Sequence, residues 1–291
     1  MRRLARFVLA LAALAAALPA CAVSYLWEVT SLTNRVYLFG TVHAGMASWY
    51  PLPRAVEDAF EDSPVLVVEA DITDPDLMQK SARATIYTPP ANLSTHVPPE
   101  DFARFKRLLP RYRLPLDQVI QMKPFMAASL LVFSEWGRLG YDAGNGVDVY
   151  LLKRAKREKK TIVEIEGVDT QIALMDSLTD AENLAVFHGT LEAIDSGLAD
   201  EQVKGMVAAW QEGDPDAVLA VAKKYDDRIP VAAEVEEKFI WSRHDAMVAK
   251  IQDYLDHGKE RHFVAVGALH LSGPRGLLAK LRARGYVVKQ L

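Results

Sequence analysis

The sequence contains a single cysteine in 291 residues. One cysteine cannot form an intrachain disulfide framework or a metal site of several thiolates. Basic residues are not in excess either. The formal net charge of −4 argues against a protein that binds duplex DNA, which needs a basic face. Half of the residues are hydrophobic and a quarter are charged, so the chain is predicted to fold around a sizeable core.

Long hydrophobic runs are also scarce. The one long stretch without a polar side chain is residues 7–20. This run is shorter than the roughly 20 apolar residues that a membrane-spanning helix needs. Arg2, Arg3 and Arg6 precede it, which is the pattern of a secretory signal. Residues 1–22 are therefore predicted to be a signal peptide, and the mature protein is expected outside the cytoplasm. Removal of the leader would make the net charge three units more negative.

Two cleavage sites overlap at the end of this leader. Leu18-Pro19-Ala20-Cys21 resembles a bacterial lipobox, in which Cys21 would be lipidated and become the new N-terminus. Ala20-Cys21-Ala22 also fits a small-x-small site for ordinary signal peptidase. The protein is accordingly expected to be either periplasmic or an envelope-anchored lipoprotein, with contact to a membrane only through a lipid on Cys21.

Residues 23–291 are predicted to form one mixed α/β domain. Strands are expected at 25–30, 35–40, 65–70, 161–166, 262–267 and 286–290, because these segments are rich in β-branched and aromatic residues. Residues 101–242 are mostly helical in pattern. Residues 231–256 are expected to form one long helix, and 274–284 another.

One local pattern occurs near both ends of the chain. Val36 to His43 and Phe263 to His270 each read as a strand followed by Gly-x-x-His, and each precedes a helix and a further strand. This order predicts two βαβ units with parallel strands. The two units are expected to form a central sheet, with the helical region as a large insertion between them.

The residues with the clearest potential for chemistry follow strand ends, where open α/β sheets bind ligands. His43 and His270 each lie just past a strand, and Glu69 and Glu166 occupy equivalent places. Two histidines with one or two glutamates suit Zn, Mn, Fe or Co. Simpler roles remain open: the histidines could bond loop carbonyls, Glu69 could pair with a buried arginine, and Glu166 could lie at a helix entry. Glu164 and Asp71 are close enough in sequence to compete for these roles.

Other charged residues have simpler interpretations. Asp148 is interpreted as a first-turn acid of a helix. The basic run from Lys153 to Lys160 is expected to be a solvated helix end rather than a nucleic-acid surface. Arg243 could be a salt-bridge partner, but we favour an orientation into the site, where an arginine could hold a developing oxyanion. The remaining histidines in polar or helical surroundings are expected at the surface: His96, His188, His244 and His257.

Several of these motifs together resemble the TraB/GumN/PrgY family, which is related to the Tiki metalloproteases. The matching segments cover nearly the whole mature chain: Leu38 to His43, Val67-Val68-Glu69, Gly146-Val147-Asp148, Glu166 with Gln171, and Val266 to Leu271 with Gly273. The resemblance implies a metal-dependent hydrolase fold with His43, Glu69 and His270 at the metal and Glu166 at a matching motif position. The family usually has an Arg-Asn pair where this chain has Arg243-His244.

The sequence thus predicts an exported, metal-dependent hydrolase with a peptidase-like reaction. A divalent transition metal (Mn, Co or Zn), held by His43, Glu69, His270 and Glu166, would lower the pKa of bound water to about 7. Glu69 or Glu166 would act as general base, and Arg243 would assist. The substrate is expected to be a peptide or another small hydrolysable molecule. Two alternatives are a non-catalytic envelope lipoprotein that binds haem or metal, and one that sequesters a signalling peptide.

Overall fold

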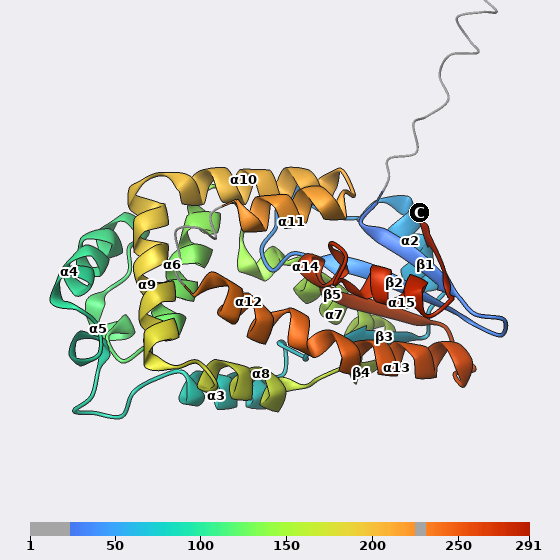
Figure 1. Ribbon diagram of the computed structural model, residues 1–291, viewed down its shortest axis with the longest axis horizontal. Helices are drawn as coiled ribbons and strands as arrows, with labels where there is room; N and C mark the ends of the chain where they lie inside the picture. The colour runs from blue at the N-terminus through green and yellow to red at the C-terminus, as the bar shows by residue number, and fades with distance from the viewer. Residues whose placement is uncertain (1–23, 225–230) are drawn as a thin grey trace, which may run out of the picture.

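The structure is a computed structural model that describes residues 24–224 and 231–291 (Figure 1). The predicted signal peptide and Cys21 lie outside the described residues. Within the described part, no helix is both long and apolar enough to cross a membrane.

The protein is built on a six-stranded mixed sheet, which confirms the predicted α/β class. The strand order is β4-β3-β5-β2-β1-β6. The four strands from β4 to β2 are parallel, whereas β1 is antiparallel to both of its neighbours. The strands are β1 (Leu26–Thr30), β2 (Arg35–Thr41), β3 (Val65–Val68), β4 (Thr161–Glu164), β5 (His262–Gly267) and β6 (Val287–Gln290).

The two predicted βαβ units are present, and both skip over neighbouring strands. The first runs from β2 through α2 (Arg54–Glu61) to β3, and β5 lies between those two strands. The second runs from β5 through α15 (Leu277–Ala283) to β6 at the sheet edge. The N- and C-terminal units therefore interleave, and β5 pairs with β2 on one side and β3 on the other.

Helices cover both faces of the sheet. Helices α13 (His244–Asp256) and α15 lie on one face, and α2 and α7 (Val147–Glu158) on the other (Figure 1). The central strands are buried on both faces, as their continuous runs of valine and leucine predict. Phe263 of β5 packs against Phe39 and Phe60 with ring centroids 5.7 and 5.4 Å apart, so aromatic contacts link the strands to α2.

The insertion forms a second, smaller core beside the sheet (Figure 1). It fully buries Phe105 on α4 (Pro99–Leu108), Leu131 on α6 (Pro124–Arg138) and Phe187 on α9 (Asp180–Asp195). The helices of this region are α3 (Pro75–Ala84), α4 (Pro99–Leu108), α5 (Leu116–Val119), α6 (Pro124–Arg138), α8 (Val168–Asp176), α9 (Asp180–Asp195), α10 (Leu198–Gln211) and α11 (Pro215–Lys223).

The prediction of one long helix over 231–256 is wrong. Helix α12 (Ala232–Phe239) ends at Ile240, whose backbone leaves the helical region with φ −123° and ψ −68°. A short 3-10 turn, Trp241–Arg243, follows before α13 begins at His244. The break buries Trp241 and turns the Arg243 side chain toward the sheet.

The predicted helix over 274–284 is also revised. A four-residue helix, α14 (Ala268–Leu271), directly follows β5, and α15 begins only at Leu277. His270 lies in α14 and is 2 % exposed. The second Gly-x-x-His therefore forms a buried helical turn rather than an open loop.

Candidate functional site

Four of the predicted site residues meet at the carboxyl edge of the parallel strands. Glu69 directly follows β3, and Glu166 lies two residues past β4. The backbone N–H of Glu166 donates to the carbonyl of Glu69 at 3.2 Å, so the two glutamates are neighbours. His270 follows β5, and its Nε2 lies 3.6 Å from Glu69 Oε2. The strand-end rule therefore places these residues correctly.

The side chain of Arg243 lies between the two glutamates and His270. Its Nε donates to Glu166 Oε1 at 2.8 Å, and its Nη2 donates to both Glu69 and Glu166. Its Nη1 lies 3.2 Å from His270 Nε2 and also donates to the carbonyl of Phe239 at 2.6 Å. The side chain is 9 % exposed, and so this guanidinium is the central cation of a buried cluster. Arg243 is thus a salt-bridge partner, and the carboxylates that it pairs with are two of the candidate site residues.

Interactions within the cluster favour the charged forms of Arg243 and Glu69. Burial alone would lower the pKa of Arg243, but the hydrogen bonds and charges of Glu166 and Glu69 raise it above its ordinary value. Burial would raise the pKa of Glu69, but Arg243 and the amide of Gly267 help to hold it well below its ordinary value. Glu69 is thus ionised at neutral pH.

A second histidine, His244, contacts the Nδ1 atom of His270. His270 Nδ1 lies 2.9 Å from His244 Nε2, and His244 Nδ1 lies 2.8 Å from the carbonyl oxygen of Arg275. His244 is fully buried, so its predicted surface location is wrong. The break after α12 explains the error, because it turns the first residue of α13 toward the core. Burial lowers the pKa of His244 to about 4, which keeps this imidazole neutral.

His43 lies beside the cluster and is held by Asp148. Its Nδ1 is 2.5 Å from Asp148 Oδ2, and its side chain is 59 % exposed. The charge of Asp148 is the main cause that raises the pKa of His43 to about 9. Glu69 raises that pKa further and Arg243 lowers it, which places His43 within electrostatic reach of the cluster.

The motif Gly146-Val147-Asp148 fastens the start of α7 to the His43 loop. The N–H of Val147 donates to the carbonyl of Val42 at 2.9 Å. A Cβ on Gly146 would lie 2.5 Å from the His43 carbonyl oxygen, so only glycine permits this approach. Asp148 is a first-turn acid, as predicted, but it also pairs with His43. Sequence reasoning missed this role, although the position of Asp148 in a compact motif was a signal for it.

Asp148→Asn should lower the pKa of His43 from about 9 towards the ordinary histidine value. Because the folded-state pKa is raised, the ion pair stabilises the fold below the unfolded pKa, and this contribution is lost as pH rises through 9. The variant should therefore lose more stability at pH 6 than at pH 10. An NMR pH titration of His43 in chelator-treated protein measures the shift. Asp253→Asn, which removes an exposed partner of His257, is the control and should leave His43 unchanged.

The glycines of the two Gly-x-x-His motifs have different roles. A Cβ on Gly40 would lie 2.3 Å from the ring of Tyr25 and 3.1 Å from the backbone of Ala268. A Cβ on Gly267 would meet Glu69 Oε1 at 3.4 Å, which is ordinary contact. The Gly267 N–H donates to that same oxygen at 2.8 Å. Gly40 thus lets the two end units pack together, whereas Gly267 presents its amide to Glu69.

Gly40→Ala should lower the free energy of unfolding by about 1–3 kcal/mol, the usual cost of overpacking a core. Gly267→Ala is the matched control, and we expect a smaller loss because its Cβ has room. Denaturant unfolding of both variants measures the difference. Equal losses would contradict the assigned packing role of Gly40.

The other candidates at the strand ends pair away from the cluster. Glu164 Oε1 accepts from the Asp71 backbone at 2.6 Å, and Asp71 pairs with Lys156 at 2.9 Å. Most of the basic run lies on the exposed surface of α7, but Arg154 is buried and pairs with Glu57, Glu61 and Glu158, so its predicted solvated location is wrong. Among the remaining histidines, His96, His188 and His257 are exposed, as predicted.

The donor atoms of the cluster are already engaged with Arg243. With the guanidinium in this place, no three His, Cys, Asp or Glu side chains in residues 24–224 and 231–291 gather closely enough to hold a metal ion. The predicted ligand set is thus only partly assembled, because His43 lies to one side.

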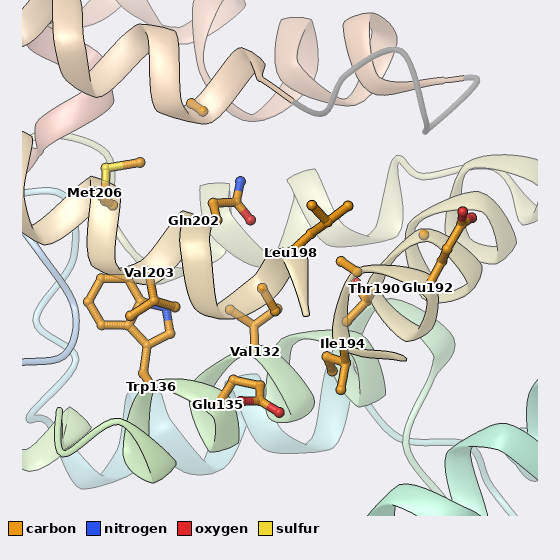
Figure 2. Close-up of a pocket in the computed structure, with 14 residues that line it drawn as sticks. Val132, Glu135, Trp136, Thr190, Glu192, Ile194, Leu198, Gln202, Val203 and Met206 are labelled. Carbon is orange, nitrogen blue, oxygen red and sulfur yellow. The ribbon is translucent and has the colours of Figure 1, made fainter. Parts of the chain in front are cut away.

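A separate apolar cavity of about 290 Å³ lies in the helical region among α6, α9 and α10 (Figure 2). Trp136, Leu198 and Val203 are among the residues that line it, and none of the predicted site residues does. Glu135 in its wall is paired with Arg138 at 2.7 Å and Arg111 at 2.9 Å. The cavity is therefore distinct from the charged cluster, and the charge of Glu135 in its wall is paired.

Comparisons with known proteins agree with the motifs. The TraB/PrgY/gumN family matches residues 25–290. The chain is 27% identical to Escherichia coli YbaP over 270 residues, which covers 89% of this chain and 93% of YbaP. It is 23% identical to the metalloprotease TIKI1 of Danio rerio and 26% identical to the metalloprotease TIKI2 of Xenopus tropicalis. Each alignment covers 91% of this chain but only 63% and 59% of those relatives. No solved structure matches the chain.

Proposed function

Because this chain belongs to the TraB/PrgY/gumN family, we propose that it is an exported, metal-dependent hydrolase that cleaves peptides or related acyl compounds. The observation that carries the proposal is the buried cluster of Glu69, Glu166, Arg243 and His270 at the carboxyl edge of the sheet. A buried arrangement of two carboxylates is costly for a fold and is typical of functional sites. The similarity to proteins named metalloproteases supports a protease-like reaction.

The donor chemistry fits a divalent transition metal. His43 and His270 each have Nδ1 tied to a second residue, Asp148 or His244. Metal-binding histidines usually have such an outer partner, which leaves the other ring nitrogen for the metal. Carboxylates and imidazoles together suit Mn, Co or Zn. His43, Glu69 and His270 would hold the ion, with Glu166 beside them. A cation bound to Glu69 and His270 would replace Arg243 Nη1 and Nη2 as their partner.

When bound, the metal would supply a Lewis acid and a water of lowered pKa. The protein side chains would accept the proton and stabilise the developing charge. Glu166 gives both of its oxygens to Arg243, whereas Glu69 gives one oxygen to the Gly267 amide and the other to Arg243. The second oxygen of Glu69 is the better placed to accept a proton once Arg243 withdraws. Arg243 would then be available to hold the negative charge of an acyl oxygen.

The decisive test is elemental analysis of natively purified protein, combined with digestion of a peptide library. We expect about one Mn, Co or Zn per chain and cleavage that a chelator abolishes and added metal restores. Glu69→Gln should remove the cleavage while retaining the fold. Glu164→Gln is a matched control, because Glu164 lies on the neighbouring strand outside the cluster. Protein that takes up none of these metals and cleaves no peptide would overturn the proposal.

Export is part of the proposal and has its own measurement. Intact mass and membrane fractionation of the protein made in a bacterium with two membranes would identify the mature N-terminus. A diacylated Cys21 in the membrane fraction would support the lipoprotein form, and a soluble chain that starts near Val23 the periplasmic form. Uncleaved protein in the cytoplasm would contradict export.

A further inference from the structure

A line of four polar groups runs from the centre of the cluster to a surface turn. Arg243 Nη1 lies 3.2 Å from His270 Nε2, and His270 Nδ1 lies 2.9 Å from His244 Nε2. His244 Nδ1 then lies 2.8 Å from the carbonyl oxygen of Arg275. Both imidazoles are buried, with 2 % of His270 and none of His244 exposed. Water therefore does not replace these partners.

The two ends of this line fix the direction of every hydrogen bond in it. A backbone carbonyl only accepts, so His244 Nδ1 carries the proton at that end. A guanidinium only donates, so His270 Nε2 presents a lone pair at the other end. An imidazole with a lone pair on Nε2 carries its ring proton on Nδ1, so His270 Nδ1 donates to His244 Nε2. The requirements from the two ends agree on one arrangement of protons.

We propose that His244 is a positioning residue that fixes His270 as the Nδ1–H tautomer, with the Nε2 lone pair accepting from Arg243. The Arg275 carbonyl orients His244, and His244 in turn orients His270.

This tautomer gives His270 a defined chemical role. A bare Nε2 can bind a metal or accept a proton, but it cannot donate one, so His270 is not poised as a general acid. The use of the lone pair as a metal ligand rests on the proposed function. The tautomer itself rests only on the hydrogen bonds and can be measured in metal-free protein.

Nitrogen-15 NMR of the imidazole rings in chelator-treated protein at pH 7.5 tests the assignment. In the wild type we expect a protonated Nδ1 and a bare Nε2 for His270. His244→Leu removes the acceptor and should release the tautomer, so that Nε2–H becomes populated. His244→Gln places an amide oxygen near the former Nε2 position and should restore the wild-type tautomer. His262→Leu removes another buried histidine that contacts a backbone carbonyl, and it should have no effect on His270.

Zn²⁺ titration of the same proteins gives a second readout. Loss of an outer partner of a ligating histidine typically weakens metal affinity 10–100-fold. We expect that loss in His244→Leu, near wild-type affinity in His244→Gln, and no loss in His262→Leu. If His244→Leu does not fold, the wild-type and His244→Gln spectra still decide the question.

The possible failures are distinguishable. Wild-type protein with Nε2–H on His270, or a His244→Leu spectrum identical to the wild type, would overturn the role of His244. Wild-type protein with the expected tautomer that binds no metal would leave that role intact and contradict the proposed metal dependence.

Discussion

Arg243→Met should lower the free energy of unfolding of the metal-free protein by about 3–5 kcal/mol at pH 7, the usual cost of removing one partner from a buried ion pair. Arg243 is the partner of both Glu69 and Glu166, which are only 15% and 7% exposed. Without the guanidinium, two neighbouring carboxylates would remain buried with no cation between them. Denaturant unfolding at fixed pH measures the loss.

Arg154→Met is the matched control for this variant. Arg154 is equally buried, at 7 % exposure, and it pairs with Glu57, Glu61 and Glu158 on the far side of the sheet. Both variants should destabilise the fold. Only Arg243→Met should be rescued by a divalent metal, because only there would a cation find two free carboxylates and a histidine. An Arg243→Met protein as stable as the wild type would contradict the central place of this cation.

The loss of stability in Arg243→Met should also depend on pH. In the wild type, the lowered pKa of Glu69 contributes stability that is present above the unfolded pKa and is lost as pH falls through the folded one. In Arg243→Met, burial would favour the protonated carboxyl, so acid should cost the variant less. The difference in stability between the two proteins should therefore shrink from pH 7 to pH 4.

The positions of the chemical groups were predictable from the sequence because sheet topology fixes them. Parallel strands end at one edge, so Glu69, Glu166 and His270 had to approach one another once their strands were recognised, whereas His43 lies beside their cluster. Valine-rich runs such as Val65–Val68 identify buried strands by composition alone. The mixed α/β class and the helical insertion follow from the same signals.

The contacts within the site could not be predicted, because they depend on side chains from remote segments. The helical periodicity of apolar residues continues through Ile240. No local sequence signal indicates that the helix breaks there and that Trp241 is buried. The location of His244 depends on that break. The pairing of Asp148 with His43 joins residues 105 positions apart, so the compact motif around Asp148 does not identify its partner.

His43→Ala and His270→Ala should each abolish metal uptake and hydrolysis, although the two histidines differ in their surroundings. The His43 side chain is more than half exposed, and its ion pair is with Asp148. Its removal should therefore lower the free energy of unfolding only slightly. His270 is buried, and its removal leaves His244 Nε2 without a donor. We expect His270→Ala to lose about 1–3 kcal/mol of stability in metal-free buffer, the cost of an unsatisfied buried polar group. Elemental analysis, peptide cleavage and unfolding measure the three quantities, with exposed His257→Ala as the control.

The double variant distinguishes a shared site from two separate ones. If both histidines serve one metal, the second substitution removes nothing further from activity, since residues that act as a unit are non-additive. Added metal should stabilise the wild type in proportion to the logarithm of its concentration over the dissociation constant, and should stabilise neither single variant. If His43→Ala retained metal and activity while His270→Ala only destabilised the fold, the cluster would be a structural ion-pair network. The Asp148–His43 pair would then need a separate explanation.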